Sequence, residues 1–135
     1  MYTLLKVKEY QVDRDVWLRN EETGTIDMCY DNSWFFDEVG FAFMEIGKSY
    51  ECKIELTGRA ETEPLTGAVP YQILSWSEQI GAKKRVKVCH NGDIYYIAPG
   101  DISDFKSKNE VWFTVFHKDL IQVDETLDGY YTMDT

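Results

Sequence analysis

The sequence predicts an all-β domain, either a small antiparallel barrel or a compact sandwich, with at most one short helix. Three observations support this prediction. Apolar and polar residues alternate with period two in several segments, turn residues separate these segments, and helical periodicity is scarce. The chain has 135 residues, the length of a single domain. A domain of this size buries roughly 68–70% of its unfolded surface and needs no disulfide to be stable.

The first half of the chain contains three strand-like segments. The segment 16–18 is joined to 26–31 by a loop that contains Gly24, which indicates a hairpin. In the second strand of this hairpin we expect the alternate residues Ile26, Met28 and Tyr30 to form the apolar, buried face. The clearest alternation follows between Gly47 and Gly58, with apolar residues at Tyr50, Cys52, Ile54 and Leu56.

The second half contains the strongest hairpin signal. Asn91-Gly92 suits the two positive φ angles of a type I′ turn and separates two alternating runs, so we expect a hairpin over 84–97. A later strand over 111–116 is apolar on both faces, which is typical of a covered strand. Residues 120–123 extend this strand or pair beside it.

Helix is expected only in short turns. The best helical candidate runs from 32 or 33 to 46, and Asp37 and Glu38 lie in its early part, as a helix N-terminus prefers. Because 41–43 also fits a strand, we expect only one turn, around 33–39. Further turns are predicted at 75–80 and 101–105. The main loop lies at 59–70.

The best single arrangement of these elements is an OB-like Greek-key barrel that carries the hairpin 84–97 as an addition. This is an analogy of strand order and does not by itself license a function. We expect one domain over 1–123, followed by an acidic, flexible tail over 124–135.

The charge of the chain narrows the classes of partner. The net charge is −10, and five of these charges follow Lys118, after which there is no basic residue. An acidic chain is poorly suited to a phosphate backbone, so nucleic acid is disfavoured and a protein, above all a basic one, is the expected partner. We expect no membrane association, because no run reaches the length of a membrane span. The N-terminus lacks a signal-peptide pattern and the three cysteines form no CxxC pair, so the expected location is the cytoplasm. The oligomeric state is left open.

No catalytic or metal-binding motif is present in the sequence. The two histidines exclude a three-histidine zinc site, and Cys89 and His90 leave opposite faces of one strand. We therefore expect no metal, no cofactor and no catalytic residue, with a small enzyme of unrecognised site kept as an alternative.

Two clusters are candidate binding sites. The first combines basic and aromatic residues, as single-strand binders do: Lys83, Lys84, Arg85, Lys87, Tyr95 and Tyr96. The alternative interpretation is that these basic residues lie on the solvent-exposed face of a hairpin, where their charge prevents aggregation through the sheet edge. The second is an aromatic group that would bind a protein if exposed, or otherwise belong to the core: Trp34, Phe35, Phe36 and Phe41.

The leading hypothesis from the sequence is a non-enzymatic module that binds a protein partner, in its sharpest form an acidic inhibitor or antitoxin-like protein. An OB-like domain that binds single-stranded nucleic acid through 83–97 is the main alternative.

Overall fold

The computed structural model describes residues 1–33 and 40–133, and over these residues the chain is mostly β. Its strands are β1 (Tyr2–Glu9), β2 (Arg14–Asn20), β3 (Ile26–Asp31), β4 (Ser49–Tyr50), β5 (Cys52–Glu61), β6 (Ala68–Ile80), β7 (Lys83–His90), β8 (Asp93–Ile97), β9 (Glu110–Val123) and β10 (Thr126–Leu127). Two short 3₁₀ helices are η2 (Pro99–Phe105) and η3 (Gly129–Thr132). No helix in this part of the chain is long and apolar enough to cross a membrane.

Five strands close into a barrel. Around the ring the order is β5, β8, β7, β6 and β9, and β9 then pairs with β5 again. The β5–β8 pair is parallel, and the other four pairs are antiparallel. This connectivity confirms the predicted small barrel and is compatible with an OB-like Greek key.

The hairpin predicted over 84–97 is present as β7 and β8. Asn91 and Gly92 have φ angles of 50° and 87°, so the turn has the two positive φ angles that the sequence predicted. The structure places this hairpin inside the closed ring, whereas the sequence placed it outside. The strands outside the barrel are instead β1 to β4. They can join the same sheet because β5 and β9 are long enough to extend beyond the barrel.

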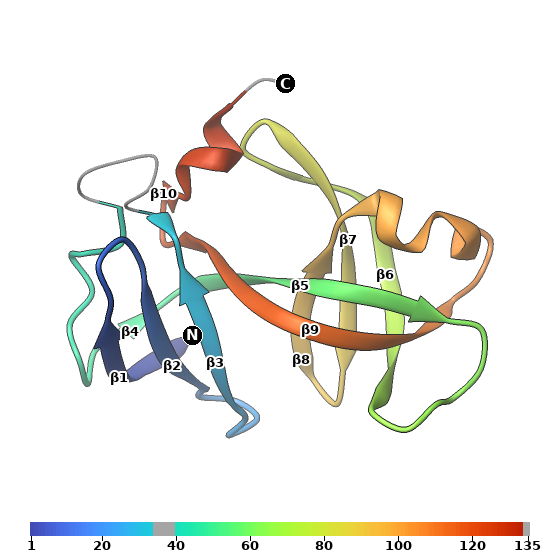
Figure 1. Cartoon of the computed structure of the whole chain (residues 1–135), viewed down its shortest axis with the longest axis horizontal. Helices are drawn as coiled ribbons and strands as arrows, with labels where there is room; N and C mark the ends of the chain where they lie inside the picture. Colours follow the sequence, from blue (N-terminus) through green and yellow to red (C-terminus); the bar gives the residue numbers. More distant parts are fainter. Residues whose placement is uncertain (34–39, 134–135) are drawn as a thin grey trace.

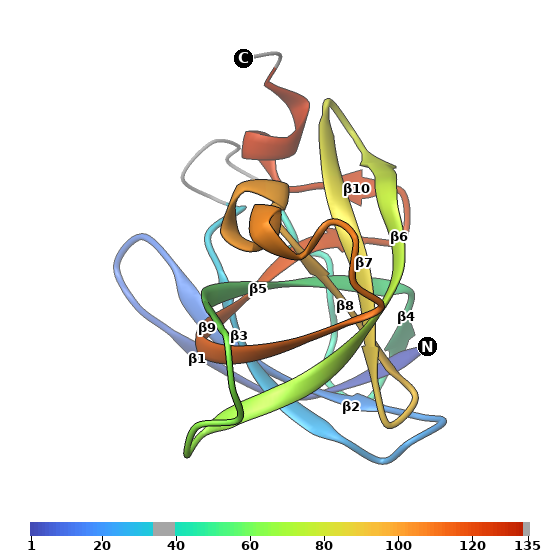
Figure 2. The same cartoon turned by 90° about the vertical axis from the view of Figure 1, so that its right-hand side faces the viewer.

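Strands β1 to β4 form a second lobe around the same two long strands (Figure 1). β9 pairs with β3 through Tyr30 and Asp119, while β4 is separated from β5 by one residue and pairs with β1. β5 and β9 therefore run through both lobes and hold them together (Figures 1 and 2).

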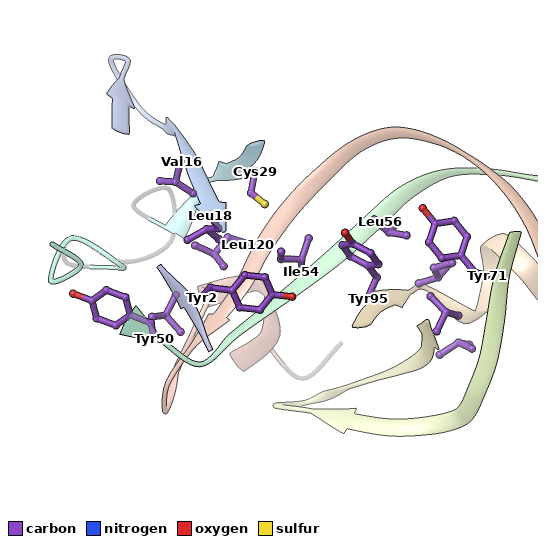
Figure 3. Close-up of a cluster of buried hydrophobic side chains, with 14 of the residues drawn as sticks. Tyr2, Val16, Leu18, Cys29, Tyr50, Ile54, Leu56, Tyr71, Tyr95 and Leu120 are labelled. Carbon is purple, nitrogen blue, oxygen red and sulfur yellow. The ribbon is translucent and has the colours of Figure 1, made fainter. Parts of the chain in front are cut away.

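One hydrophobic core continues through both lobes (Figure 3). It runs from Leu18 in the first lobe, past Ile54 and Leu120 on the shared strands, to Leu56 and Tyr71 in the barrel. Its continuity explains why no linker divides the sequence.

Gly58 marks a close approach of the two shared strands. The register of β5 against β9 shifts between Thr57 and Gly58. A Cβ atom at Gly58 would lie 1.9 Å from the carbonyl oxygen of Thr114, so only glycine fits this bulge.

The turns of the two lobes are joined by a buried carboxylate. Asp93, in the β7–β8 turn region, accepts hydrogen bonds from Asn20 Nδ2 at 3.0 Å, Thr23 Oγ1 at 2.5 Å and Thr25 Oγ1 at 2.7 Å. These three donors surround the β2–β3 turn, so the two hairpins are fixed to each other.

The helical predictions had different outcomes. The turn at 101–105 is confirmed within η2, and most of the turn proposed at 33–39 lies outside the described residues. The turn predicted at 75–80 is wrong, because these residues form the end of β6 and pair with β7 across two irregularities in register. Such bulges break the period-two pattern, which hides the strand in the sequence.

The chain continues to pack beyond the expected boundary at 123. β10 pairs with β9, and η3 lies beside the end of the β6–β7 hairpin (Figure 2), where Ala82 N donates to Tyr131 O at 2.8 Å. Tyr131 is 1% exposed and forms a second apolar cluster on the outside of the barrel with Ile80, Tyr96 and Ile121. The acidic composition of 124–135 predicted a flexible tail, but it did not show that Tyr131 docks.

Candidate functional site

Strand β3 presents its apolar residues to solvent. Asp27, Cys29 and Asp31 point inward and are buried, whereas Ile26 is 56% exposed and Met28 and Tyr30 are each 37% exposed. The prediction that Ile26, Met28 and Tyr30 form the buried face is therefore wrong. The alternation was correctly predicted, but its orientation is reversed.

The buried carboxylate of Asp27 is stabilised by a hydrogen-bond donor and by a cation. Tyr95 donates a hydrogen bond to Asp27 Oδ2 at 2.6 Å, and the ammonium group of Lys118 forms an ion pair with Oδ1. Burial raises the pKa of Tyr95 strongly, and its hydrogen bond to Asp27 adds to the shift, so the phenol stays protonated as a donor.

Asp31 is held by a separate network. Arg14 Nε lies 2.6 Å from Asp31 Oδ2, and the backbone N–H and hydroxyl of Ser33 donate to Oδ1 at 3.0 and 2.5 Å. Arg14 also donates to the carbonyl of Phe41 at 2.6 Å. A buried ion pair with this many hydrogen bonds fixes the inward face of β3, so the strand cannot turn over to bury its apolar residues.

The outward residues of β3 adjoin two rings on neighbouring strands. Met28 lies opposite Trp17 of β2, and the ring of His117 of β9 lies 5.4 Å from that of Tyr30. We call these five residues the β3 face: Trp17, Ile26, Met28, Tyr30 and His117.

Charged groups border the β3 face. Asp15 is the cross-strand neighbour of Tyr30, and Asp119 pairs with Tyr30 on the other side, where its carboxylate lies 2.8 Å from His117 Nδ1. At the opposite end, Arg19 is the neighbour of Ile26. Lys6 lies level with the middle of the face, where its ammonium is 4.7 Å from the centre of the Trp17 ring. The face is thus acidic at its Tyr30 end and basic at its Ile26 end.

The predicted nucleic-acid residues do not form one open surface. Tyr95 is buried in the barrel core, and Tyr96 is buried beneath the C-terminal segment, so neither ring can stack on a base.

The basic residues of that set are largely engaged. Arg85 is buried, with its Nε 2.6 Å from Glu55 Oε2, and Lys83 is buried with its ammonium 4.5 Å from the Tyr130 ring centre. Lys87 lies 3.5 Å from Glu78, and Lys84 is exposed. The predicted basic-aromatic site is corrected accordingly: the core and the C-terminal segment cover its two rings and Arg85, and only Lys84 and Lys87 keep side chains open to solvent.

The predicted aromatic protein-binding group is only partly described. Trp34, Phe35 and Phe36 lie outside the described residues. Phe41 is fully buried in the core, so its placement in an exposed binding surface is wrong and the core interpretation holds for it.

Cys29 and Cys52 lie in surroundings that disfavour a thiolate. Burial raises the pKa of Cys29 well above its usual value and that of Cys52 to about 12. Among the described residues, no group of three or more histidine, cysteine, aspartate or glutamate side chains is arranged to hold a metal ion.

Asp128 makes a testable contribution to the pH dependence of stability. Burial raises its pKa from 3.8 to about 6, with Asp31 adding to the shift, and its Oδ1 has no hydrogen-bond partner in the described part of the chain. Since the unfolded chain loses this proton at lower pH than the folded one, the free energy of unfolding should fall between about pH 4 and pH 6 and then level off.

We expect Asp128→Asn to remove this loss and to raise the free energy of unfolding at pH 7 by on the order of 2 kcal/mol. Urea unfolding at pH 4 and pH 7 measures the effect. Asp101→Asn, at an exposed position, is the control, and an equal response of both variants to pH would contradict the assignment to Asp128.

Comparison of the chain with protein-family models, with curated proteins and with solved structures finds no match.

Proposed function

We propose that this protein is a non-enzymatic binding module that engages a protein partner through the β3 face. The observation that carries the proposal is the reversed orientation of β3, which turns an isoleucine, a methionine and a tyrosine outward while two aspartates are buried beneath them. Single exposed apolar residues are common on soluble proteins, but a group of large apolar side chains on one surface is typical of an interaction site.

The chemistry of the β3 face suits a macromolecule. Trp, Tyr and Met are enriched at protein interfaces, and Trp and Tyr are among the residues that most often dominate the binding energy. Small ligands, by contrast, are bound in concave pockets, and three pockets formed by the described residues are each lined by residues outside the β3 face.

The border charges suggest how the partner is oriented. Asp15 and Asp119 lie beside Tyr30, so we expect an apolar partner surface with a basic group at that end. The net charge of −10 favours association with a basic protein more generally. An inhibitor or antitoxin-like role in the cytoplasm is the sharpest form of this proposal, and OB-like strand connectivity is compatible with it without requiring nucleic acid.

The proposal is tested with Met28→Glu, which places a charge at the centre of the β3 face. Leu74→Glu is the matched control, because Leu74 is 51% exposed on β6, away from this face. Both substitutions should change stability by only about 0.5 kcal/mol, as is usual for exposed positions.

The wild-type protein is first used to capture a stoichiometric partner from a host extract. The partner is then identified and purified, and calorimetry measures its binding to the wild type, to Met28→Glu and to Leu74→Glu. We expect Met28→Glu to weaken binding by at least about tenfold, as for a central interface residue, and Leu74→Glu to leave it unchanged. Equal binding by both variants would refute the proposal. So would a wild-type dimer in sedimentation equilibrium that Met28→Glu dissociates, because a second copy would then occupy the face.

A further inference from the structure

A second candidate site lies in the other lobe, where the β6–β7 hairpin and η2 supply most of its lining residues. Figure 1 shows these two elements on the barrel side of the molecule. The site is a pocket of about 540 Å³, within the range of small-ligand sites. Its lining residues are Trp76, Ser77, Lys84, Pro99, Gly100, Ser103 and Lys106. None of them belongs to the β3 face.

The wall of this pocket is anchored to the barrel. Trp76 is half-buried and packs against the core while also lining the pocket, so its ring is held in place. On the opposite wall, the buried side chain of Ile102 fixes η2. Beside Gly100 the space is open, because a Cβ atom built there would meet no atom within 4 Å.

The charge of the pocket is opposite to that of the protein. Lys84 and Lys106 are the charged residues that line it, and no described acidic residue does so. Asp101 and Asp104 lie on η2 and are exposed, but they do not line the pocket. A basic pocket in a chain of net charge −10 selects an anionic ligand by local charge alone.

We propose that this pocket binds a planar aromatic anion, with the ring against Trp76 and a phosphate or carboxylate group between Lys84 and Lys106. Aromatic rings stack on tryptophan without regard to the identity of the ring, and lysine binds phosphate as a point charge. The hydroxyl groups of Ser77 and Ser103 provide further donors in the lining. The inference is independent of the β3 face.

Four probes are compared. Adenosine 5′-monophosphate and benzoate are aromatic anions, with a phosphate and a carboxylate group respectively. Adenosine has the ring without the charge, and inorganic phosphate has the charge without the ring. Binding is followed by calorimetry and by chemical-shift changes of the indole N–H of Trp76. We expect at least one of the two aromatic anions to bind at least about tenfold more tightly than adenosine or phosphate, because each of these lacks one recognition element. The preferred anion distinguishes a phosphate from a carboxylate ligand.

Three variants locate the binding. Lys84→Gln and Lys106→Gln should each weaken it by roughly three- to tenfold, in keeping with the loss of one charge-assisted contact, and Trp76→Leu should abolish the preference for the aromatic anion. Lys8→Gln is the control, because Lys8 also lies over an aromatic ring, that of Tyr10 at 5.5 Å, but in the other lobe. The proposal is overturned if neither aromatic anion binds at millimolar concentration, or if the pocket variants bind as well as Lys8→Gln.

Discussion

Replacing Arg14 with methionine is expected to lower the free energy of unfolding by about 3–5 kcal/mol, because it leaves the buried carboxylate of Asp31 without its cation. Asp31 is 0% exposed, so water cannot replace the guanidinium that now lies 2.6 Å from it. The variant also removes the hydrogen bond from Arg14 to the carbonyl of Phe41. Urea unfolding followed by circular dichroism measures the loss.

Two further variants separate the buried charge from other effects of the substitution. Arg19→Met lies on the same strand but is exposed, and we expect a change within about 0.5 kcal/mol. In the double variant Arg14→Met/Asp31→Leu the unpaired charge is gone, so much of the lost stability should return. If Arg14→Met alone costs no more than Arg19→Met, the ion pair does not fix the orientation of β3.

The position of most strands follows from local sequence, because alternation and turn chemistry are local properties. The strand around 52–56 and the Asn91-Gly92 hairpin were both predicted in this way and are present. Ring closure was harder to predict, because it depends on the length of β5 and β9. Each of these strands also contains register shifts that interrupt the pattern.

The orientation of β3 could not be predicted from its own residues. Period-two alternation shows that a strand has two different faces, and the usual expectation buries the apolar one. Here the opposite holds, because Arg14, Tyr95 and Lys118 come from other strands to compensate the two inward aspartates. The sequence holds one signal that this strand is unusual. Aspartate is uncommon in β-strands, yet Asp27 and Asp31 both lie on one face of this strand.

The basic-aromatic hairpin illustrates a different difficulty. The alternation of this hairpin predicts one face in contact with solvent, whose residues would be available for binding. In the structure the C-terminal segment covers the outer face of β7 and β8, which buries Tyr96 and Arg85. Contacts between residues this far apart in the sequence leave no local signal.

The same segment provides the second large effect. We expect Tyr131→Ala to lower the free energy of unfolding by about 3–5 kcal/mol, the usual cost of truncating a buried aromatic side chain. The ring packs against Ile80, Tyr96 and Ile121, and its hydroxyl donates to Glu55 Oε2 at 2.6 Å and accepts from Arg85 Nε at 3.0 Å. Thermal and urea unfolding of the variant measure this cost.

The adjacent tyrosine provides the matched control for this prediction. Tyr130 is 43% exposed, so Tyr130→Ala should cost about 1 kcal/mol or less even though the variant loses the contact with Lys83. Tyr131→Phe keeps the ring and should cost only about 1 kcal/mol, since Glu55 and Arg85 still pair with each other. A docked Tyr131 ring therefore predicts a large loss of unfolding free energy for Tyr131→Ala and small losses of similar size for Tyr131→Phe and Tyr130→Ala. Equal, small effects of all three would show that residues 124–133 form the flexible tail that their acidity suggests.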